Sequence, residues 1–376
     1  MSRTPDPRDV AVYLPDLSGG GAERLHVRLA GLLPRFGYRP RFLLDRQGGA
    51  LMDAVPPGCR VDALAAPRPL AALPKLIRHL RADPPGALIV NTEHMAVIAA
   101  AARAVARVPT KLIITQHNAF GEQLKRANWQ WKVLPPLYRR ALAAADAILC
   151  VSSGVADDLA ARTGLARSGM DVIYNGVVDE DFETRAAGRA DHPFFAAGPV
   201  ILAMGRMVPQ KDFATLVDAF ARFAPGAPDT KLIILGEGPL RPALEAQIAA
   251  AGLADRIALP GFVDNPLPWL RAARLFVLSS RFEGFGNVLA EALACGTPVA
   301  STNCPFGPDE ILEDGRFGPL VPVGDAGALA EAMARTLAAP LPADQLRARG
   351  QDFTVRACAR HYATLLDRLQ GQAIAA

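Results

Sequence analysis

SRFEGFGNVLAEALACGTPVAS, residues 280–301, joins a strand pattern to a helix pattern through two closely spaced glycines. The run ARLFVLSS (residues 273–280) is short and mostly apolar, as expected of a strand buried on both faces of a parallel sheet. The turn EGFG (residues 283–286) allows close approach of the backbone to a ligand, and a helix pattern follows. The first amides of such a helix lack internal partners and lie at the positive end of its dipole. We therefore expect a diphosphate at Gly286, Asn287, Val288 and Leu289.

Two carboxylates frame this turn. Glu283 follows the strand, and Glu291 lies eight positions later inside the helix pattern. Because a carboxylate accepts two hydrogen bonds from neighbouring hydroxyls, one acid could hold a ribose and the other a second sugar. Either glutamate alone could equally be an ordinary residue near a helix N-terminus. The spacing of the pair suits a nucleotide-sugar.

Length and composition predict two α/β domains. A chain of 376 residues with 51% hydrophobic and 21% charged residues is packed and globular, and it exceeds what one core usually organises. Strand patterns alternate with helix patterns, first in RPRFLLD, ALIVNTEH and KLIITQHN and again after residue 199. This alternation is typical of doubly wound parallel sheets, whose ligands gather outside the carboxyl ends of the strands.

Charge is unevenly distributed along the chain. Residues 1–178 hold 23 Lys and Arg against 14 Asp and Glu, whereas residues 179–376 hold 18 against 23. One segment, residues 121–140, interleaves basic and aromatic side chains, namely Lys125, Arg126, Lys132, Arg139 and Arg140 with Trp129, Trp131 and Tyr138. This composition indicates an anionic membrane surface as a partner, although an ordinary helix with core tryptophans would share it.

The remaining bulk features bear on localisation. Five cysteines without a CxxC pair argue against both a disulfide framework and a zinc site. No secretory signal, unbroken membrane span or nucleic-acid-binding motif is recognised. We expect a cytoplasmic protein, peripheral on the inner face of the cytoplasmic membrane, with neither metal nor cofactor; the triplet Asp179–Asp181 is a weak metal candidate in a loop.

Further candidate ligand contacts follow other predicted strands. Three glycines, among them Gly20 and Gly21, follow the first strand without the GxGxxG spacing of a dinucleotide site. His94 and His117 both lie at strand ends. After the strand at 199–204, Arg206 and Lys211 could converge on a diphosphate. The turns containing Gly205, Gly236, and Phe262 with Val263 would line the same pocket.

Together these motifs resemble the retaining glycosyltransferases of family 4, nearly from end to end of the chain. The specific parts are the pair Glu283 and Glu291, which are separated by seven residues, the pattern GR-x4-KD at residues 205–212, the glycine loop, and the histidine of ITQHN. The resemblance implies two Rossmann-like domains facing a cleft (GT-B type), an acceptor domain at residues 1–195 and a donor domain at residues 196–355. It also implies a final helix (residues 356–376) that packs back on the first domain.

The resemblance further implies a reaction. A sugar would pass, with retention, from a nucleotide-diphosphate-sugar such as a UDP-sugar to an acceptor hydroxyl, in lipid-linked or cell-surface glycan assembly. Glu283, His117, Arg206 and Lys211 would be the catalytic residues, and no metal would be needed. A nucleotide-sugar epimerase on the same scaffold, or a silent nucleotide-sugar-binding protein, remain alternatives, and an NAD-dependent dehydrogenase is disfavoured by the missing fingerprint.

Overall fold

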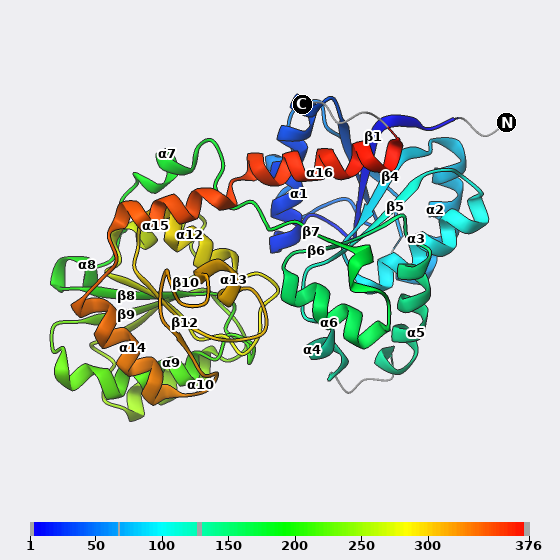
Figure 1. Cartoon of the computed structure of the whole chain (residues 1–376). Coiled ribbons are helices and arrows are strands. Elements are labelled where there is room, and N and C mark those ends of the chain that lie inside the picture. The colour runs from blue at the N-terminus through cyan, green and yellow to red at the C-terminus, as the bar shows by residue number, and fades with distance from the viewer. Residues whose placement is uncertain (1–3, 67, 126–129, 372–376) are drawn as a thin grey trace. The chain divides into compact units, whose positions relative to one another are not determined.

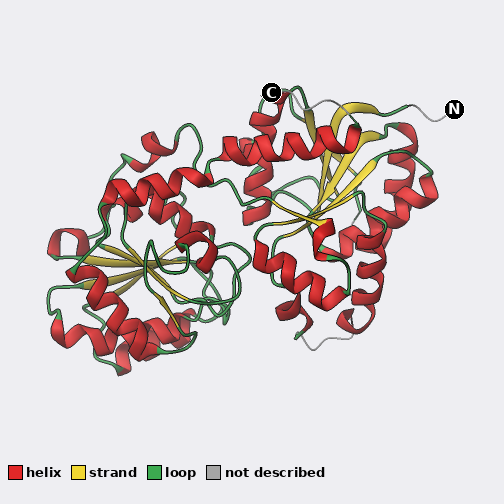
Figure 2. Cartoon of the chain, viewed as in Figure 1, coloured by secondary structure: helices red, strands yellow, loops and turns green. Residues whose placement is uncertain are grey.

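The computed structural model describes residues 4–66, 68–125 and 130–371, which form two compact units. The first unit comprises the chain up to Gly176 and the segment from Val355 onward, and the second comprises Val177–Thr354. Each unit contains a parallel sheet with helices on its faces (Figures 1 and 2). The predicted α/β class with two doubly wound sheets is confirmed.

The first unit is built on a seven-stranded sheet in the order β3-β2-β1-β4-β5-β6-β7. Its strands are β1 Asp6–Leu14, β2 Arg39–Leu44, β3 Arg60–Ala63, β4 Pro85–Val90, β5 Lys111–Gln116, β6 Ala147–Cys150 and β7 Met170–Val172. Its helices are α1 Gly21–Leu32, α2 Pro69–Ala82, α3 Glu93–Ala106, α4 Phe120–Leu124, α5 Gln130–Ala143, α6 Ser153–Thr163 and α16 Val355–Gln370. Short 3₁₀ turns occur at Leu33–Phe36, Met52–Ala54 and Arg167–Gly169.

The C-terminal helix α16 belongs to the core of the first unit, as predicted. Its apolar face, including Tyr362 and Leu366, is buried in the core of the first unit, and the helix packs on α1 (Figure 1). Its last turns are tied down by Asp367, whose carboxylate accepts hydrogen bonds from Tyr38 at 2.6 Å and Arg8 at 3.1 Å. The far end of the chain therefore completes a core that the N-terminal residues begin.

The second unit is built on a six-stranded sheet in the order β10-β9-β8-β11-β12-β13. Its strands are β8 Val200–Met204, β9 Lys231–Leu235, β10 Ile257–Gly261, β11 Leu275–Leu278, β12 Val299–Thr302 and β13 Leu320–Val321. Its helices are α7 Phe182–Ala186, α8 Phe194–Ala197, α9 Phe213–Phe223, α10 Arg241–Ala250, α11 Leu267–Ala272, α12 Asn287–Cys295, α13 Pro308–Leu312, α14 Ala326–Ala338 and α15 Ala343–Gly350. Short 3₁₀ turns occur at Ala224–Gly226 and Gln351–Phe353.

The boundary between the units differs from the one expected at residue 195. Residues 177–195, read from the sequence as the end of the first domain and a linker, pack in the second unit. Helix α7 lies against α11: Arg271 pairs with Glu183 at 2.6 Å, and the Asn265 side chain donates to the Arg185 carbonyl at 2.8 Å. The ring of Phe195 also contacts Trp269. These contacts are long-range, so local composition did not reveal them.

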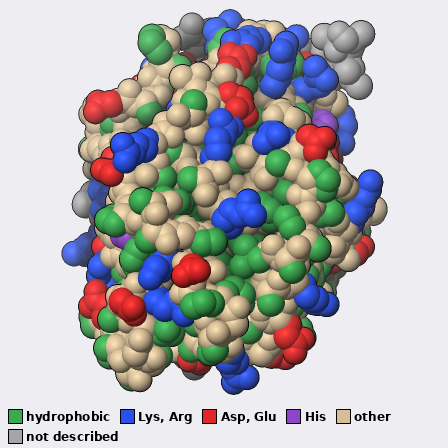
Figure 3. Space-filling view, turned by 90° about the vertical axis from the view of Figure 1, so that its left-hand side faces the viewer, with side chains coloured by type: hydrophobic (Ala, Val, Ile, Leu, Met, Phe, Trp, Pro, Cys, Tyr) green, Lys and Arg blue, Asp and Glu red, His purple; other side chains and the backbone are tan. Residues whose placement is uncertain are grey.

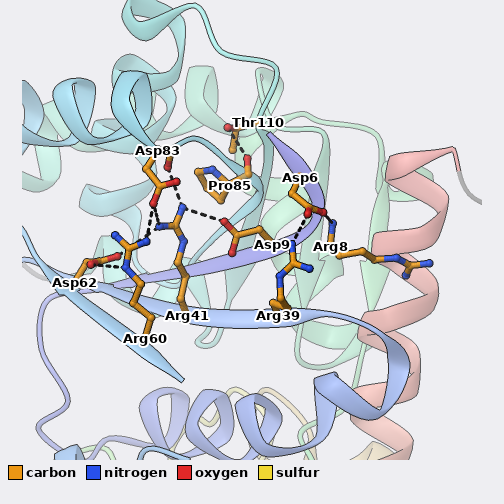
Figure 4. A network of polar contacts seen from close by, with 10 residues as sticks. All are labelled: Asp6, Arg8, Asp9, Arg39, Arg41, Arg60, Asp62, Asp83, Pro85 and Thr110. Atoms are coloured by element: carbon orange, nitrogen blue, oxygen red, sulfur yellow. Dashed lines mark hydrogen bonds and ion pairs between the residues drawn. The ribbon is translucent and has the colours of Figure 1, made fainter. Parts of the chain in front are cut away.

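An ionic network closes the amino-terminal edge of the first sheet (Figure 4). Arg41 on β2 is only 3% exposed, and its guanidinium reaches Asp83 at 2.6 Å, Asp9 at 3.2 Å and Asp62 at 3.5 Å. Arg60 on β3 also pairs with Asp62 and Asp83, but its side chain is 56% exposed. Burial alone would raise the pKa of Asp83; hydrogen bonds and charges from the two arginines outweigh it and lower the pKa. Arg41 therefore neutralises acids from three other elements.

We expect Arg41→Met to lower the free energy of unfolding by roughly 3 kcal/mol, because removal of the buried cation leaves neighbouring carboxylates uncompensated. Arg60→Met is the matched control: it faces two of the same acids from an exposed position and should cost at most about 1 kcal/mol. Urea denaturation at neutral pH measures both. Equal losses for the two variants would show that the burial of Arg41 is energetically unimportant.

Candidate functional site

The predicted diphosphate loops lie side by side where the connections of the second sheet change direction. β8 is flanked by β9 and by β11, so the chain leaves it on one side and returns on the other. The loop after β8 (205–212) and the loop after β11 (279–286) therefore meet at the carboxyl edge of adjacent strands. Open α/β sheets bind their ligands at such a switch point.

A charged pair joins the two loops. Lys211 Nζ donates to Glu283 Oε1 at 2.5 Å, and Ser280 Oγ donates to the same oxygen at 2.6 Å. Glu283 is 6% exposed, while the neighbouring Ser279 hydroxyl donates to the Lys211 carbonyl at 2.7 Å. Two consecutive serines thus fix both members of the pair. From the sequence, Lys211 was expected to bind phosphate and Glu283 to bind a sugar. In the structure the two side chains contact each other.

Arg206 differs from Lys211 in its surroundings. Its side chain is exposed, and among the described residues its guanidinium makes no hydrogen bond or ion pair. Lys211 in contrast is partly buried and held by Glu283. One cation at this edge is therefore available to an incoming anion, and the other is already positioned.

Glycines let these loops pack tightly. A Cβ at Gly205 would meet the Lys211 side chain at 3.2 Å, and one at Gly236 would lie 2.1 Å from the Gly205 carbonyl oxygen. Both glycines also have positive φ, 154° and 124°. At Gly238 a Cβ would strike the backbone of Met207 at 2.5 Å. Close packing of one loop on another therefore explains these glycines, which the sequence had associated with ligand approach.

The N-terminus of α12 is partly as predicted. Gly286 is its N-cap residue with φ 99°, in the conformation that favours glycine. The Leu289 N–H, however, donates to the Gly286 carbonyl at 2.8 Å, so a phosphate must use the preceding amides of Asn287 and Val288 or displace that bond. Glu291, one turn further, is partly exposed.

A turn following β12 holds the backbone of Glu283. The Glu283 N–H donates to the Pro305 carbonyl at 2.6 Å, and the Phe306 N–H donates to the Glu283 carbonyl at 3.2 Å. Gly307 is required here because a Cβ would lie 2.0 Å from the carbonyl oxygen of Phe285. Sequence reasoning found this turn but not its bonds to Glu283.

The turn after β10 presents an unusual apolar side chain. Phe262 is 64% exposed and Val263 is partly exposed, at the carboxyl end of the sheet. Exposed large aromatic side chains are uncommon, and a flat ring at a ligand edge offers a stacking surface. The position of Phe262 is compatible with a base contact, which stays a prediction.

The switch point of the first sheet lies between β1 and β4 and gathers a second set of residues. Gly20 and Gly21 are exposed at the start of α1, where Gly20 is the N-cap. His117 follows β5 and is partly buried; burial, reinforced by the nearby His26, lowers its pKa to about 3. His117 belongs to a group of three side chains. Asn91, after β4, contacts both His117 and His26, which lies on α1.

Sequence reasoning missed Asn91 and His26. The signal available was NTEH directly after a strand, from which only His94 was singled out. His94 is partly buried on α3, where burial lowers its pKa.

The basic aromatic segment is only partly described. Arg126 and Trp129 lie outside the described residues, as do the side chains of Trp131 and Lys132. Tyr138 is not interfacial, contrary to the expectation: it is 1% exposed, and its hydroxyl donates to Gln116 at 2.6 Å. Lys125, Arg139, Arg140 and Leu137 are exposed. Among the described side chains of α5, the exposed Leu137, Arg139 and Arg140 thus flank a buried tyrosine.

The acidic triplet after the first sheet is held by an arginine. Asp179 and Asp181 both pair with Arg185, at 2.5 and 3.1 Å. Within the described ranges, no group of His, Cys, Asp and Glu has a geometry that could hold a metal ion, and no helix is long and apolar enough to cross a membrane. The face drawn in Figure 3 intersperses acidic and basic side chains among apolar ones.

Taken together, fold and site are typical of a nucleotide-binding α/β enzyme with an anion site at a sheet switch point. Residues 198–339 match the family described as glycosyl transferases group 1, and residues 19–181 match glycosyltransferase family 4. The chain belongs to the family 4 glycosyltransferases, enzymes that transfer a sugar from a nucleotide-sugar.

Two bacterial relatives show where similar proteins act. The N-acetylgalactosamine-N,N'-diacetylbacillosaminyl-diphospho-undecaprenol 4-alpha-N-acetylgalactosaminyltransferase of Campylobacter jejuni is 28% identical over 334 residues, covering 85% of this chain and 87% of that protein. The lipopolysaccharide core biosynthesis glycosyltransferase LpsE of Rhizobium meliloti is 34% identical over 56% of this chain and 59% of its own length.

Solved structures confirm the fold. Anabaena HepE in complex with UDP superimposes with a TM-score of 0.77 at 20% identity, covering 96% of this chain and all of that one. Sucrose-phosphate synthase from Thermosynechococcus elongatus gives a TM-score of 0.78 at 23% identity, over 97% and 99% of the two chains. The architecture is therefore the GT-B fold of family 4.

The contact between Lys211 and Glu283 predicts strong energetic coupling. In a double-mutant cycle of Lys211→Met and Glu283→Gln, we expect a coupling of about 1–3 kcal/mol in the free energy of unfolding, because each single change strands a mostly buried charge. Arg281 and Asp212 form the control pair, 3.0 Å apart with the arginine side chain 57% exposed, and should couple by under about 1 kcal/mol. Urea unfolding decides; additive effects at Lys211 and Glu283 would contradict the pairing.

Proposed function

We propose that this glycosyltransferase moves a sugar, with retention, from a UDP-sugar to a lipid-linked saccharide in bacterial cell-envelope glycan assembly. The observation that carries the proposal is the set of two cations in the loop after β8: Arg206 is exposed and pairs with no other described residue, and Lys211 is held by Glu283. Similarity to the diphospho-undecaprenol-dependent enzyme over 85% of this chain supports the acceptor class. A UDP complex among the structurally similar proteins supports the donor base.

In the proposed donor complex, the diphosphate lies at the carboxyl edge of β8 and β11. Arg206 can grip two phosphate oxygens, and Lys211 acts as a point charge. Gly205, Gly236 and the first amides of α12 bound the same space, and Phe262 with Val263 faces the base. Glu291 accepts from the ribose hydroxyls.

Chemical assistance would come mainly from preorganised charge. Departure of the nucleoside diphosphate places negative charge on the phosphate oxygens, which Arg206, Lys211 and the α12 amides stabilise without a metal. Glu283 keeps Lys211 oriented and, when the donor is bound, can turn an oxygen to the sugar. We propose a front-face transfer in which the departing phosphate accepts the proton of the acceptor hydroxyl.

The acceptor and its lipid would be met by the first unit. Gly20, Gly21 and His117 lie at its switch point, and the exposed Lys125, Arg139 and Arg140 with Leu137 can meet an anionic bilayer surface. Tyr138 is buried and takes no part in this contact, and salt should weaken its electrostatic component.

The decisive experiment combines donor binding with transfer. We expect UDP-sugars to raise the melting temperature more than GDP- or ADP-sugars, since a ligand of the folded state alone stabilises it. With a lipid-linked saccharide in anionic vesicles, the bound donor should then yield an α-linked product from an α-linked donor, read by NMR. Interconversion of the donor without any acceptor would instead establish the epimerase, and a bound donor with neither reaction would indicate a silent binding protein.

Arg206→Ala and Lys211→Ala should each lower kcat by about 10²–10³, the loss seen on removal of one preorganised donor, equivalent to roughly 2.7–4 kcal/mol. Arg274→Ala is the matched control, because Arg274 is also exposed but precedes β11, at the opposite edge of the same sheet. Activity should persist in EDTA. Wild-type kcat in both loop variants, or an EDTA loss restored by Mg²⁺, would overturn the metal-free diphosphate assignment.

A further inference from the structure

Three polar side chains from separate elements meet at the switch point of the first sheet. The Asn91 Oδ1 atom lies 2.8 Å from His26 Nε2 and 3.0 Å from His117 Nε2. Asn91 is 7% exposed and His26 is 1% exposed, whereas His117 retains some exposure. The two imidazole rings are edge-on, with centroids 6.2 Å apart. Asn91 therefore bridges a buried histidine to the histidine at the ligand edge.

The chemistry of the bridge fixes the protons. A side-chain carbonyl oxygen has two lone pairs and no hydrogen, so both imidazoles must donate from Nε2. A neutral imidazole that carries its proton on Nε2 has an unprotonated Nδ1, which can only accept. We propose that Asn91 is a positioning residue that holds His117 in the neutral Nε2–H tautomer, so that His117 meets its ligand through an accepting Nδ1.

The surroundings favour the neutral form of both rings. Burial lowers the pKa of His26 to about 4, against an opposing contribution from Asn91, and that of His117 to about 3. On the other side of His26, Tyr362 of α16 packs edge-on at 6.1 Å, and burial raises the pKa of its hydroxyl far above the ordinary value. A second cation 6.2 Å from the first would be unfavourable in such a site.

The remaining polar groups near His117 act through Gln116. The Gln116 Nε2 atom donates to Glu93 at 3.2 Å and to the Asn118 carbonyl at 2.8 Å, while its Oε1 accepts from Tyr138. These bonds fix the backbone on both sides of His117. The described titratable groups on the elements packed around it include Glu93 on α3, Tyr138 on α5, Tyr362 on α16 and His26 on α1, and Cys150 and Cys358 lie near the two tyrosines.

One atom of the bridge is left without a partner. Among the described residues, the buried Asn91 Nδ2 has no hydrogen-bond acceptor. An unpaired buried donor costs about 1–3 kcal/mol, so Asn91 is not optimised for stability alone. Rotation of the amide by half a turn would direct Nδ2 to both rings, force both to accept at Nε2, and give His117 a donating Nδ1–H. The two amide orientations therefore predict opposite hydrogen-bonding roles for His117.

The consequence for catalysis rests on the proposed function, which places a sugar beside His117. As an acceptor, His117 can orient a sugar hydroxyl but cannot deliver a proton to the departing phosphate. This assigns it to substrate positioning and leaves the proton of the acceptor hydroxyl to the phosphate. Asn91 and His26 act through His117 and need not touch the sugar.

Histidine ¹⁵N NMR of the intact protein tests the tautomer directly, because the chain has only six histidines. His26 and His117, assigned with His26→Gln and His117→Gln, should show the Nε2–H pattern and remain neutral down to pH 5. An Nδ1–H pattern for His117, or protonation near its ordinary pKa of about 6.5, would overturn the proposal. This readout needs no donor, so it stands apart from any failure of the transferase assay.

Asn91→Asp adds a test by substitution. A carboxylate at the bridge should raise the pKa of both rings, so that His117 becomes protonated as the pH falls toward 5 and kcat/KM falls at least about ten-fold over the same range. Asn118→Asp places the same charge on an exposed neighbour and should shift the His117 titration far less. Equal shifts in the two variants, or none in Asn91→Asp, would contradict the bridge. If NMR shows the expected tautomer but no sugar is transferred to any acceptor, the proposed function is wrong and the proposed role of Asn91 is still supported.

Discussion

In each unit a parallel sheet changes winding direction once, and the chemistry of the protein follows from that constraint. A strand at the switch point has neighbours reached by connections that leave it on opposite sides, so no helix can cover the carboxyl edge between them. In the second unit the edge lies between β8 and β11, and in the first between β1 and β4. Polar loops fill the space that helices leave. Arg206, Lys211 and Glu283 follow the two strands at the second switch point, and the loops after β9 and β10 add Gly236, Phe262 and Val263 along the same carboxyl edge of the sheet.

The second edge is built around a buried ion pair, whereas the histidine cluster at the first edge is held by neutral hydrogen bonds. Lys211 and Glu283 form a partly desolvated ion pair, with Ser279 and Ser280 holding both ends. Such a pair costs free energy to bury, and its presence is best understood as preorganisation of charge for an anionic ligand. His26, Asn91 and His117 use neutral hydrogen bonds instead. A cluster of neutral hydrogen-bonding groups suits a ligand that offers hydroxyls, and a cluster of cations suits one that offers phosphates.

Sequence patterns predicted the elements well because buried parallel strands and glycine turns leave strong local signals. The strand, turn and helix at residues 275–295, the loop at Arg206 and the C-terminal helix were all placed from such signals. Contacts between distant segments were not: Lys211 meets Glu283 across 72 positions, and Asn91 meets His26 across 65. The burial of Tyr138 and the packing of residues 177–195 on α11 also depend on tertiary contacts that composition does not encode. The functional roles of the site residues remain predictions, since position alone does not specify which hydroxyl or phosphate each one meets.

The two edges of the first sheet differ in what their polar groups do. Those at the amino edge bond mainly to one another, and those at the carboxyl edge keep atoms that can bond to a ligand. At the amino edge, the two terminal nitrogens of Arg41 pair with three carboxylates, while its buried Nε has no partner among the described residues. At the carboxyl edge, the Asn91 Nδ2 atom has no partner in the described part of the chain, and the bridge leaves the Nδ1 atom of His117 uncommitted. A cation that is surrounded by carboxylates has little charge left to attract an anionic ligand. A polar atom that is held in place without a partner can still form a hydrogen bond with a ligand.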